Sequence, residues 1–98
     1  MKPHVSLIIP AYNVSRFLDE TLDSVKAQSV EPSSFETILI DDCSTDKTLE
    51  IAKSKSLGMS NLKVFSNIAN MGTAVTRNKA ICLASSNWIM LLDSDDLL

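Results

Sequence analysis

The sequence is poor in glycine, cysteine and histidine, and each of these scarcities disfavours a class of catalytic or binding site. The 98 residues include two glycines, and no G-x-x-x-x-G-K-[ST] motif follows any apolar run, which disfavours a P-loop NTPase. The two cysteines, Cys43 and Cys82, fit reduced thiols. Because no histidine lies near Cys43, this residue is interpreted as part of a loop and not as a nucleophile. His4 stands at the start of an apolar run and receives no role.

Long apolar runs are also absent. The longest stretches are about five residues, whereas a membrane-spanning helix needs roughly 20. The apolar run near the N-terminus ends at Pro10 and is too short for the core of a signal peptide. We therefore expect a cytoplasmic location, and the sequence leaves open whether a parent protein is peripheral to the membrane.

The chain has no excess of basic charge. Nine Lys and Arg residues stand against 12 Asp and Glu residues, giving a net charge of −3 and a pI near 4.9. This balance argues against a general nucleic-acid binder, which needs a basic face. A nucleotide held through a metal ion is still compatible with it. The length and the 45% apolar content predict a single domain over residues 1–98 with a genuine core.

Apolar runs alternate with amphipathic segments along the whole chain. Runs rich in β-branched and large apolar residues predict strands, and segments with apolar residues at helical spacing predict helices. In the first such helix, Val14, Leu18, Leu22 and Val25 share one face. The predicted strands are 4–10, 35–42, 62–67 and 88–93, and the predicted helices are 14–29, 44–58 and 72–86.

This strict β-α alternation predicts an α/β fold. Right-handed crossovers would give a Rossmann-like half-domain, with a parallel sheet of about four strands in the order 3-2-1-4 and helices on both faces. In such sheets ligands bind beyond the carboxyl ends of the strands, where the winding reverses. Within the third helix we expect Ala74, Asn78 and Ile81 on one face, and we expect Trp88 and Cys82 to pack in the core.

Acidic residues gather where that ligand site is expected. Half of the 12 acidic residues follow the second and fourth predicted strands, and these are Asp41, Asp42, Asp46, Asp93, Asp95 and Asp96. Clustered carboxylates repel one another and raise one another's pKa values, a penalty that a divalent cation removes. Oxygen ligands suit Mg²⁺, Mn²⁺ or Ca²⁺. A solvated Asp-Ser turn after each strand is the simpler interpretation of either cluster alone.

Other candidate residues are ambiguous from the sequence. Arg77, in the middle of the third predicted helix, could reach a base or phosphate, or could be an exposed helix charge. Asn70 and Gly72 mark a turn and a helix start, where backbone N–H groups can favour an anion. Tyr12 and Asn13 follow the first strand and would line the same crevice.

Four blocks of the chain resemble, in order, the amino-terminal half of a family 2 inverting glycosyltransferase with the GT-A fold. "VSLIIPAYN" resembles the opening strand and nucleotide loop of that family. "ILIDDCSTDKT" resembles its "DDGSTD" block, "NMGTAVTRNKAICLA" its "N-x-G-x-x-x-x-R-N" helix, and "WIMLLDSDD" the strand leading to its "DxD" motif. Together the blocks cover essentially the whole chain.

The resemblance implies a nucleotide-diphosphate sugar donor, often UDP-linked, a divalent cation (Mg²⁺ or Mn²⁺) and a place in polysaccharide, glycolipid or glycoprotein synthesis. It implies that Pro10, Ala11 and Tyr12 border the base and ribose, and that Asp41 or Asp42 bonds the uracil ring. It also places Arg77 near the base or phosphates. At the metal, Asp95 would be the main ligand, with Asp93 approaching ribose and metal and Asp96 adjoining.

The chain departs from the family pattern in two ways. Cys43 replaces the usual glycine of "DDGSTD", so this residue is strained if the loop needs a positive φ. The acceptor-binding half and its catalytic base, which in the family follow the "DxD" motif, are not present. We therefore expect the 98 residues to be a truncated donor-binding part with no catalytic residue, and to be inactive alone. Its acceptor, whether glycan, lipid or protein, is not indicated.

Two other functions are compatible with the sequence, and the edge of the fourth strand has a consequence for self-association. Asp93 and Asp95 have the spacing of the nucleophile and acid/base in haloacid dehalogenase-like phosphatases, but that motif normally opens its domain, and here it comes last. A non-catalytic nucleotide- or metal-binding module is the second alternative. If nothing covers the fourth strand, its edge presents unpaired backbone groups beside apolar side chains, which predicts self-association through this edge.

Overall fold

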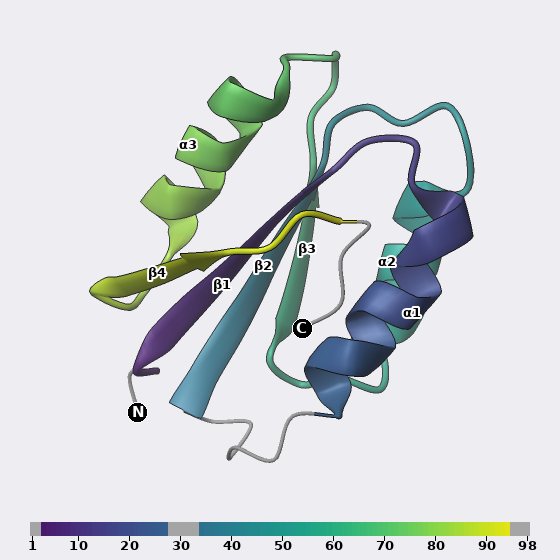
Figure 1. The fold of residues 1–98 in the computed structure, drawn as a ribbon. Helices are drawn as coiled ribbons and strands as arrows, with labels where there is room; N and C mark the ends of the chain where they lie inside the picture. The colour runs from purple at the N-terminus through teal and green to yellow at the C-terminus, as the bar shows by residue number, and fades with distance from the viewer. Residues whose placement is uncertain (1–2, 28–33, 95–98) are drawn as a thin grey trace.

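The computed structural model describes residues 3–27 and 34–94 as an α/β structure built around one parallel sheet (Figure 1). The sheet has the strand order β3-β2-β1-β4, which confirms the predicted topology. Among the helices described, none has both the length and the apolar character of a membrane span. The elements are β1 (Val5–Ala11), α1 (Ser15–Lys26), β2 (Phe35–Asp41), α2 (Thr48–Ser56), β3 (Leu62–Ser66), α3 (Thr73–Leu83) and β4 (Trp88–Leu91).

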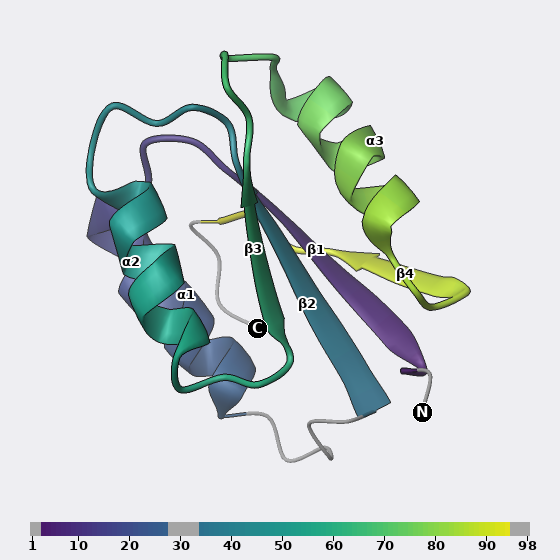
Figure 2. The ribbon, with the colours of Figure 1, turned by 180° about the vertical axis from the view of Figure 1, so that it is seen from behind.

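Helices cover both faces of the sheet, as predicted. Figures 1 and 2 show α1 and α2 on one side of the strands and α3 on the other. Leu18, Leu22 and Val25 of α1 are fully buried, which confirms the predicted helical face. They pack with alternate residues of the two central strands, such as Leu7 and Leu39, because successive strand side chains point to opposite faces. The cores on the two faces are therefore separate.

The face that α3 turns to the sheet differs from the prediction. Thr76 and Ala80 are the buried residues of α3, whereas Ala74, Asn78 and Ile81 are exposed. Ala80 packs against Ile8, Ile38 and Ile40. A small residue at this position allows the helix to lie close to the sheet. Cys82, predicted to be in the packing, is exposed.

The strand β4 is not buried, contrary to the prediction for Trp88 and its neighbours. All four residues of β4 are exposed, and Trp88 is 75% exposed. In the described part of the chain β4 pairs only with β1, so its other edge has no partner strand. The large apolar side chains of β4 therefore form a surface and not a core.

Helix boundaries are shorter than the sequence indicated. The second helix begins at Thr48, and residues 44–47 form a loop. Asp41 accepts a hydrogen bond from the N–H of Ser44 at the start of this loop, and Asp46 accepts one from the N–H of Thr48 at its end. Gly58 follows the helix without a left-handed conformation, since Gly72 is the glycine with positive φ in the described residues. The third helix ends at Leu83, where Ser85 and Ser86 turn their N–H groups to the buried side chains of Glu36 and Ser6.

Candidate functional site: a cavity at the carboxyl ends of the strands

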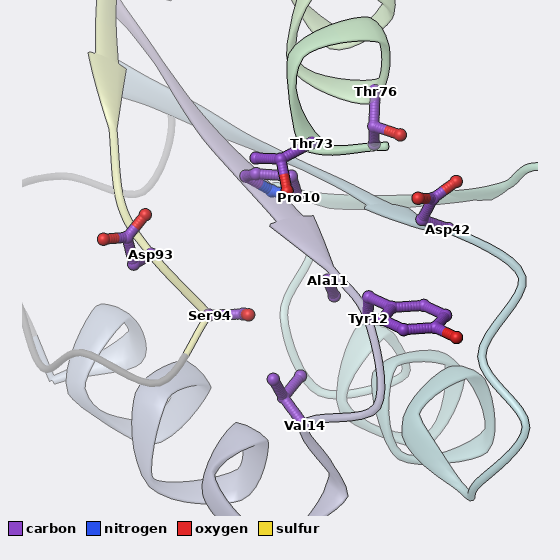
Figure 3. A pocket seen from close by; sticks show the side chains of 9 residues that line it. All are labelled: Pro10, Ala11, Tyr12, Val14, Asp42, Thr73, Thr76, Asp93 and Ser94. Carbon is purple, nitrogen blue, oxygen red and sulfur yellow. The ribbon is translucent and has the colours of Figure 1, made fainter. Parts of the chain in front are cut away.

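A cavity of about 280 Å³ lies where β1, β2 and β4 end and α3 begins (Figure 3). This is the edge of the sheet at which a ligand site is expected in α/β folds. Its volume is near the lower end of the roughly 300–1,000 Å³ typical of small-molecule pockets. It can therefore enclose part of a nucleotide-sized ligand. Its lining residues are Pro10, Ala11, Tyr12, Val14, Asp42, Thr73, Thr76, Asp93 and Ser94.

The structure brings together most of the described residues that the sequence nominated. Figure 3 shows Asp42 and Asp93 on opposite sides of the end of β1, with Tyr12 beyond that end. Sequence reasoning missed Val14, Thr73, Thr76 and Ser94. The two threonines had a detectable signal, because they stand three residues apart just after Gly72 and therefore share a helix face.

Asp42 is the best-connected residue of the cavity. It is 4% exposed, and its Oδ1 atom accepts hydrogen bonds from Asn67 Nδ2 at 2.9 Å and from the Met71 N–H at 2.8 Å. Its Oδ2 atom accepts one from the Gly72 N–H at 2.9 Å. These bonds fasten the loop before α3 to the end of β2.

The same contacts keep Asp42 ionised. Burial would raise the pKa of its carboxyl group, but the hydrogen bonds from Asn67, Met71 and Gly72, together with Thr76, outweigh it and lower the pKa below its usual value. The cavity therefore holds a fixed negative charge that acts only as a hydrogen-bond acceptor.

Asp41 and Arg77 do not line the cavity. Asp41 is 2% exposed and accepts hydrogen bonds from the N–H and hydroxyl of Ser44, so its carboxylate shapes the following loop. The sequence left Asp41 and Asp42 as alternatives, and the geometry favours Asp42. Arg77 comes one position after Thr76, a turn of about 100° around the helix, which takes it away from the cavity. Its Nε atom is buried without a hydrogen-bond partner among the described residues.

Asp46 also faces away from the cavity, because it ties together the starts of two helices. Its carboxylate accepts hydrogen bonds from the N–H and hydroxyl of Thr48 and from the N–H of Ser15. Burial would raise its pKa, but the bonds from Thr48 and Ser15 prevail and lower the pKa to about 2. This carboxylate is therefore used in the fold, contrary to the idea that all six acids converge on one crevice.

The loop that carries Tyr12 is held by the neighbouring loop after β2. Asn13 adopts a positive φ of 51°, and its Oδ1 atom accepts a 2.9 Å hydrogen bond from the N–H of Thr45. Its own N–H donates to Ser44 Oγ at 2.9 Å. Cys43 also has a positive φ, of 60°, so the condition under which strain was expected at this residue is met.

Of the three predicted metal ligands, Asp93 is the one that lies within the described residues. Asp93 is exposed at the cavity, and the adjacent Ser94 is held by its carbonyl oxygen, which accepts a 2.9 Å hydrogen bond from Thr21 Oγ1. Asp95 and Asp96 lie outside the described residues. Within residues 3–27 and 34–94, no group of three His, Cys, Asp or Glu side chains is arranged to hold a metal ion. A single carboxylate at a cavity nevertheless suits Mg²⁺ or Mn²⁺, which commonly bind through one or two carboxylates plus phosphates.

Fold and cavity together define an α/β protein with a Rossmann-like strand order and a cavity at the carboxyl ends of its strands, where the hydrogen-bonded carboxylate of Asp42 lies on one side of β1 and the exposed Asp93 on the other. The chain belongs to the family described as Glycosyl transferase family 2, whose model matches residues 6–98. This finding confirms the resemblance noted from the four sequence blocks.

The names of curated relatives agree with the family. The chain is 41% identical over 95 residues to the putative teichuronic acid biosynthesis glycosyltransferase TuaG of Bacillus subtilis, covering 97% of this chain and 37% of that protein. It is 38% identical over 92 residues to the poly(ribitol-phosphate) β-N-acetylglucosaminyltransferase TarS of Staphylococcus aureus, covering 93% of this chain and 16% of that protein. The chain thus spans well under half the length of these relatives.

Two solved structures share the fold closely. TarS residues 1–349 in complex with UDP-GlcNAc superpose with a TM-score of 0.89 at 38% identity, covering 99% of this chain and 27% of that one. The mannosyltransferase PcManGT from Pyrobaculum calidifontis, in complex with GDP-Man and Mn²⁺, gives a TM-score of 0.90 at 25% identity, covering 99% and 29%. The predicted GT-A architecture is therefore confirmed.

Proposed function

We propose that this chain is the donor-binding part of an inverting glycosyltransferase that transfers a sugar from a UDP-linked donor to an acceptor. The observation that carries the proposal is the cavity in which Asp42 and Asp93 flank the end of β1, in a chain of glycosyl transferase family 2. The complex of TarS with UDP-GlcNAc supports a UDP-linked donor.

We propose different tasks for the two acids of the cavity. Tyr12 and Asp42 would contact the base, with the Asp42 carboxylate accepting a hydrogen bond from a ring N–H. Pro10 and Ala11 would border the base and ribose, because they end the central strand. Asp93, exposed on the other side of β1, would approach the ribose and the diphosphate. Asp41 and Arg77 would support this site without lining it.

A divalent cation, Mg²⁺ or Mn²⁺, fits the exposed carboxylate of Asp93. Asp95 and Asp96 follow in the sequence, and we propose that they complete the protein ligands, with Asp95 the main one. When bound, the cation would supply Lewis-acid stabilisation of the negative charge that develops on the departing nucleoside diphosphate. The Mn²⁺ in the PcManGT complex supports this choice.

The remaining chemistry requires groups beyond those described. An acceptor hydroxyl would attack the anomeric carbon from the face opposite the leaving group, while a general base takes its proton. We propose that this base lies in a further part of the enzyme, since the chain spans 37% of TuaG and 16% of TarS. The names of these relatives support a role in polysaccharide synthesis. The isolated chain would then bind donor without transferring sugar.

The test is an NMR titration of the 98-residue chain with UDP, with and without Mg²⁺. We expect saturable shifts centred on Tyr12, Asp42 and Asp93, and line broadening of the same region by Mn²⁺. Shifts elsewhere, or none in a folded spectrum, would contradict the proposal. Sugar transfer by the isolated chain would contradict the assignment of the base to another part. A phosphatase would instead release phosphate from a phosphoester, and the family match does not favour this alternative.

We also propose that the isolated chain self-associates through β4. The support is the edge of β4 that pairs with no described strand, together with exposed Trp88, Met90 and Leu91 beside it. Two copies related by a two-fold axis would pair their β4 strands antiparallel and cover these side chains. In a longer protein another segment could occupy the same edge.

A further inference from the structure

A buried chain of hydrogen bonds connects the surface of α3 to the cavity. Asn67, just after β3, is 5% exposed, and its Oδ1 atom accepts a 2.7 Å hydrogen bond from Lys79 Nζ. Its Nδ2 atom donates to Asp42 Oδ1 at 2.9 Å and to Thr76 Oγ1 at 3.0 Å. Of these four residues, Asp42 and Thr76 line the cavity, whereas Asn67 and Lys79 do not.

The chemistry of the partners fixes the orientation of the Asn67 amide. An ammonium group only donates, so the amide oxygen must face Lys79. A carboxylate only accepts, so the amide nitrogen must face Asp42. The positive Lys79 therefore holds the amide oxygen, and the negative Asp42 holds the amide nitrogen. Every polar atom of this buried side chain has a partner. Without Lys79 the buried oxygen would lose its donor, which is unfavourable.

The position of Asp42 depends in turn on Asn67. Oδ1 of Asp42 has one bond from the Asn67 side chain and one from the Met71 backbone, and this pair determines how the carboxylate is rotated. That rotation decides which way the two carboxylate oxygens face at the cavity. The bond from Asn67 to Thr76 fixes the neighbouring part of the cavity wall, contributed by α3, in the same way.

We infer that Lys79 is a positioning residue of the donor cavity, acting through the amide of Asn67 on the carboxylate of Asp42 and the hydroxyl of Thr76. The inference rests on the proposed function for its ligand, a nucleoside diphosphate. Lys79 itself does not touch the ligand. Its ammonium group begins a chain of hydrogen bonds that fixes two lining residues of the cavity relative to each other: Asp42 after β2 and Thr76 on α3.

The experiment compares four versions of the 98-residue chain: unsubstituted, Lys79→Met, Lys79→Arg and Lys53→Met. Lys79→Met keeps most of the side-chain length and removes the donor, whereas Lys79→Arg retains a donor. Lys53→Met removes the same charge from an exposed position on α2, away from the cavity. Two quantities are measured by NMR: the side-chain amide signals of Asn67 without ligand, and the dissociation constant for UDP with Mg²⁺.

We expect Lys79→Met to shift the Asn67 amide signals and to speed their exchange with water, and to weaken UDP binding about three- to tenfold, the change in an equilibrium constant typical of one hydrogen bond. Lys79→Arg should restore both quantities most of the way, and Lys53→Met should change neither. The rest of the NMR spectrum of Lys79→Met shows whether this variant is folded, and this separates an effect on the site from a general loss of stability.

The inference is overturned if Lys79→Met leaves the Asn67 signals unchanged, or if those signals change while the affinity for UDP stays the same. A loss of affinity of equal size in Lys53→Met would also overturn it, because the effect would then be one of net charge. Failure of the unsubstituted chain to bind UDP would instead contradict the proposed function, and the Asn67 signals would still report whether Lys79 orients the amide.

Discussion

The carboxylate of Asp42 accepts a 2.9 Å hydrogen bond from the backbone N–H of Gly72, a residue 30 positions further along the chain. This bond joins the end of β2 to the start of α3 at the edge of the cavity that Asp42 lines. Gly72 has a φ of 90°, which few other residues adopt easily, and no atom lies within 4 Å of the position a Cβ would take. Glycine is therefore required here by its backbone conformation and not by lack of space.

Replacing Asp42 by Asn should weaken both folding and ligand binding. An amide has one oxygen where the carboxylate has two, so at least one of the three donors from Asn67, Met71 and Gly72 loses its acceptor. We expect the free energy of unfolding in urea to fall by about 1–3 kcal/mol and UDP affinity to fall at least about tenfold. Glu20→Gln, an exposed change on α1, is the matched control and should alter neither. Unchanged UDP affinity in Asp42→Asn would contradict the assignment of Asp42 to the cavity.

Glu36 should affect stability without affecting the site. It is 3% exposed at the amino end of the sheet, where it accepts hydrogen bonds from Ser6 Oγ, Lys63 Nζ and the Ser85 N–H at 2.6, 3.0 and 2.6 Å. Burial would raise its pKa, but these donors, beginning with Ser6, lower it. We expect Glu36→Gln to lower the free energy of unfolding by about 1–3 kcal/mol, measured in urea. UDP affinity of the folded variant should be unchanged, and a parallel loss of affinity would show that the two ends of the sheet are coupled.

Asp46 predicts a specific dependence of stability on pH. Its pKa is about 2 in the folded chain and near the ordinary value of 3.8 in the unfolded chain. Because the folded-state pKa is the lower one, its contribution is fully present above about pH 4 and is lost as the pH falls toward 2. We expect the difference in unfolding free energy between the unsubstituted chain and Asp46→Asn to be constant from pH 7 to about 4 and to shrink below it. A difference that grew on acidification would contradict the predicted sign.

Replacement by glycine should change the stability of the fold in opposite directions at Cys43 and Cys82. Cys43 has a φ of 60°, a conformation that costs a side chain with a Cβ about 1–2 kcal/mol. Glycine removes that cost but adds freedom to the unfolded chain, so Cys43→Gly should stabilise by about 0.5–1 kcal/mol. Cys82 is exposed within α3, where glycine should destabilise by about 0.3 kcal/mol, because cysteine itself is a poor helix former. Thermal unfolding under reducing conditions measures the change in unfolding free energy for each variant. If Cys43→Gly is destabilised as Cys82→Gly is, the Cys43 loop is unstrained.

A charged residue placed on β4 should make the proposed dimer dissociate. Leu91 is 50% exposed on β4, and a lysine in its place would oppose pairing of two such strands. Sedimentation equilibrium should show a dimer for the unsubstituted chain and a monomer for Leu91→Lys. Leu57→Lys, at a position 90% exposed after α2, is the control and should remain dimeric. A monomeric unsubstituted chain at millimolar concentration would refute self-association.

The sequence by itself determined the topology. Alternation of strand and helix signals, with right-handed crossovers, left the order β3-β2-β1-β4 as the expected arrangement, and the apolar face of α1 was readable because its spacing is regular. The carboxyl ends of neighbouring parallel strands must share an edge, so Tyr12, Asp42 and Asp93 were predictable as neighbours. The resemblance also drew attention to Cys43, because the family has a glycine there, but it left open whether the backbone has a positive φ.

Only the tertiary structure decided what each acid does and which surfaces are covered. Asp41, Asp42 and Asp46 are alike in sequence terms, and they differ because separate donors reach them: Ser44, then Gly72, then Thr48 and Ser15. Burial of α3 and β4 was mispredicted because it depends on neighbours and not on composition. Thr76 is buried on the face of α3 that packs on the sheet, where Asn67 supplies a partner for its hydroxyl, and Trp88 is exposed on β4, an edge strand in the described sheet.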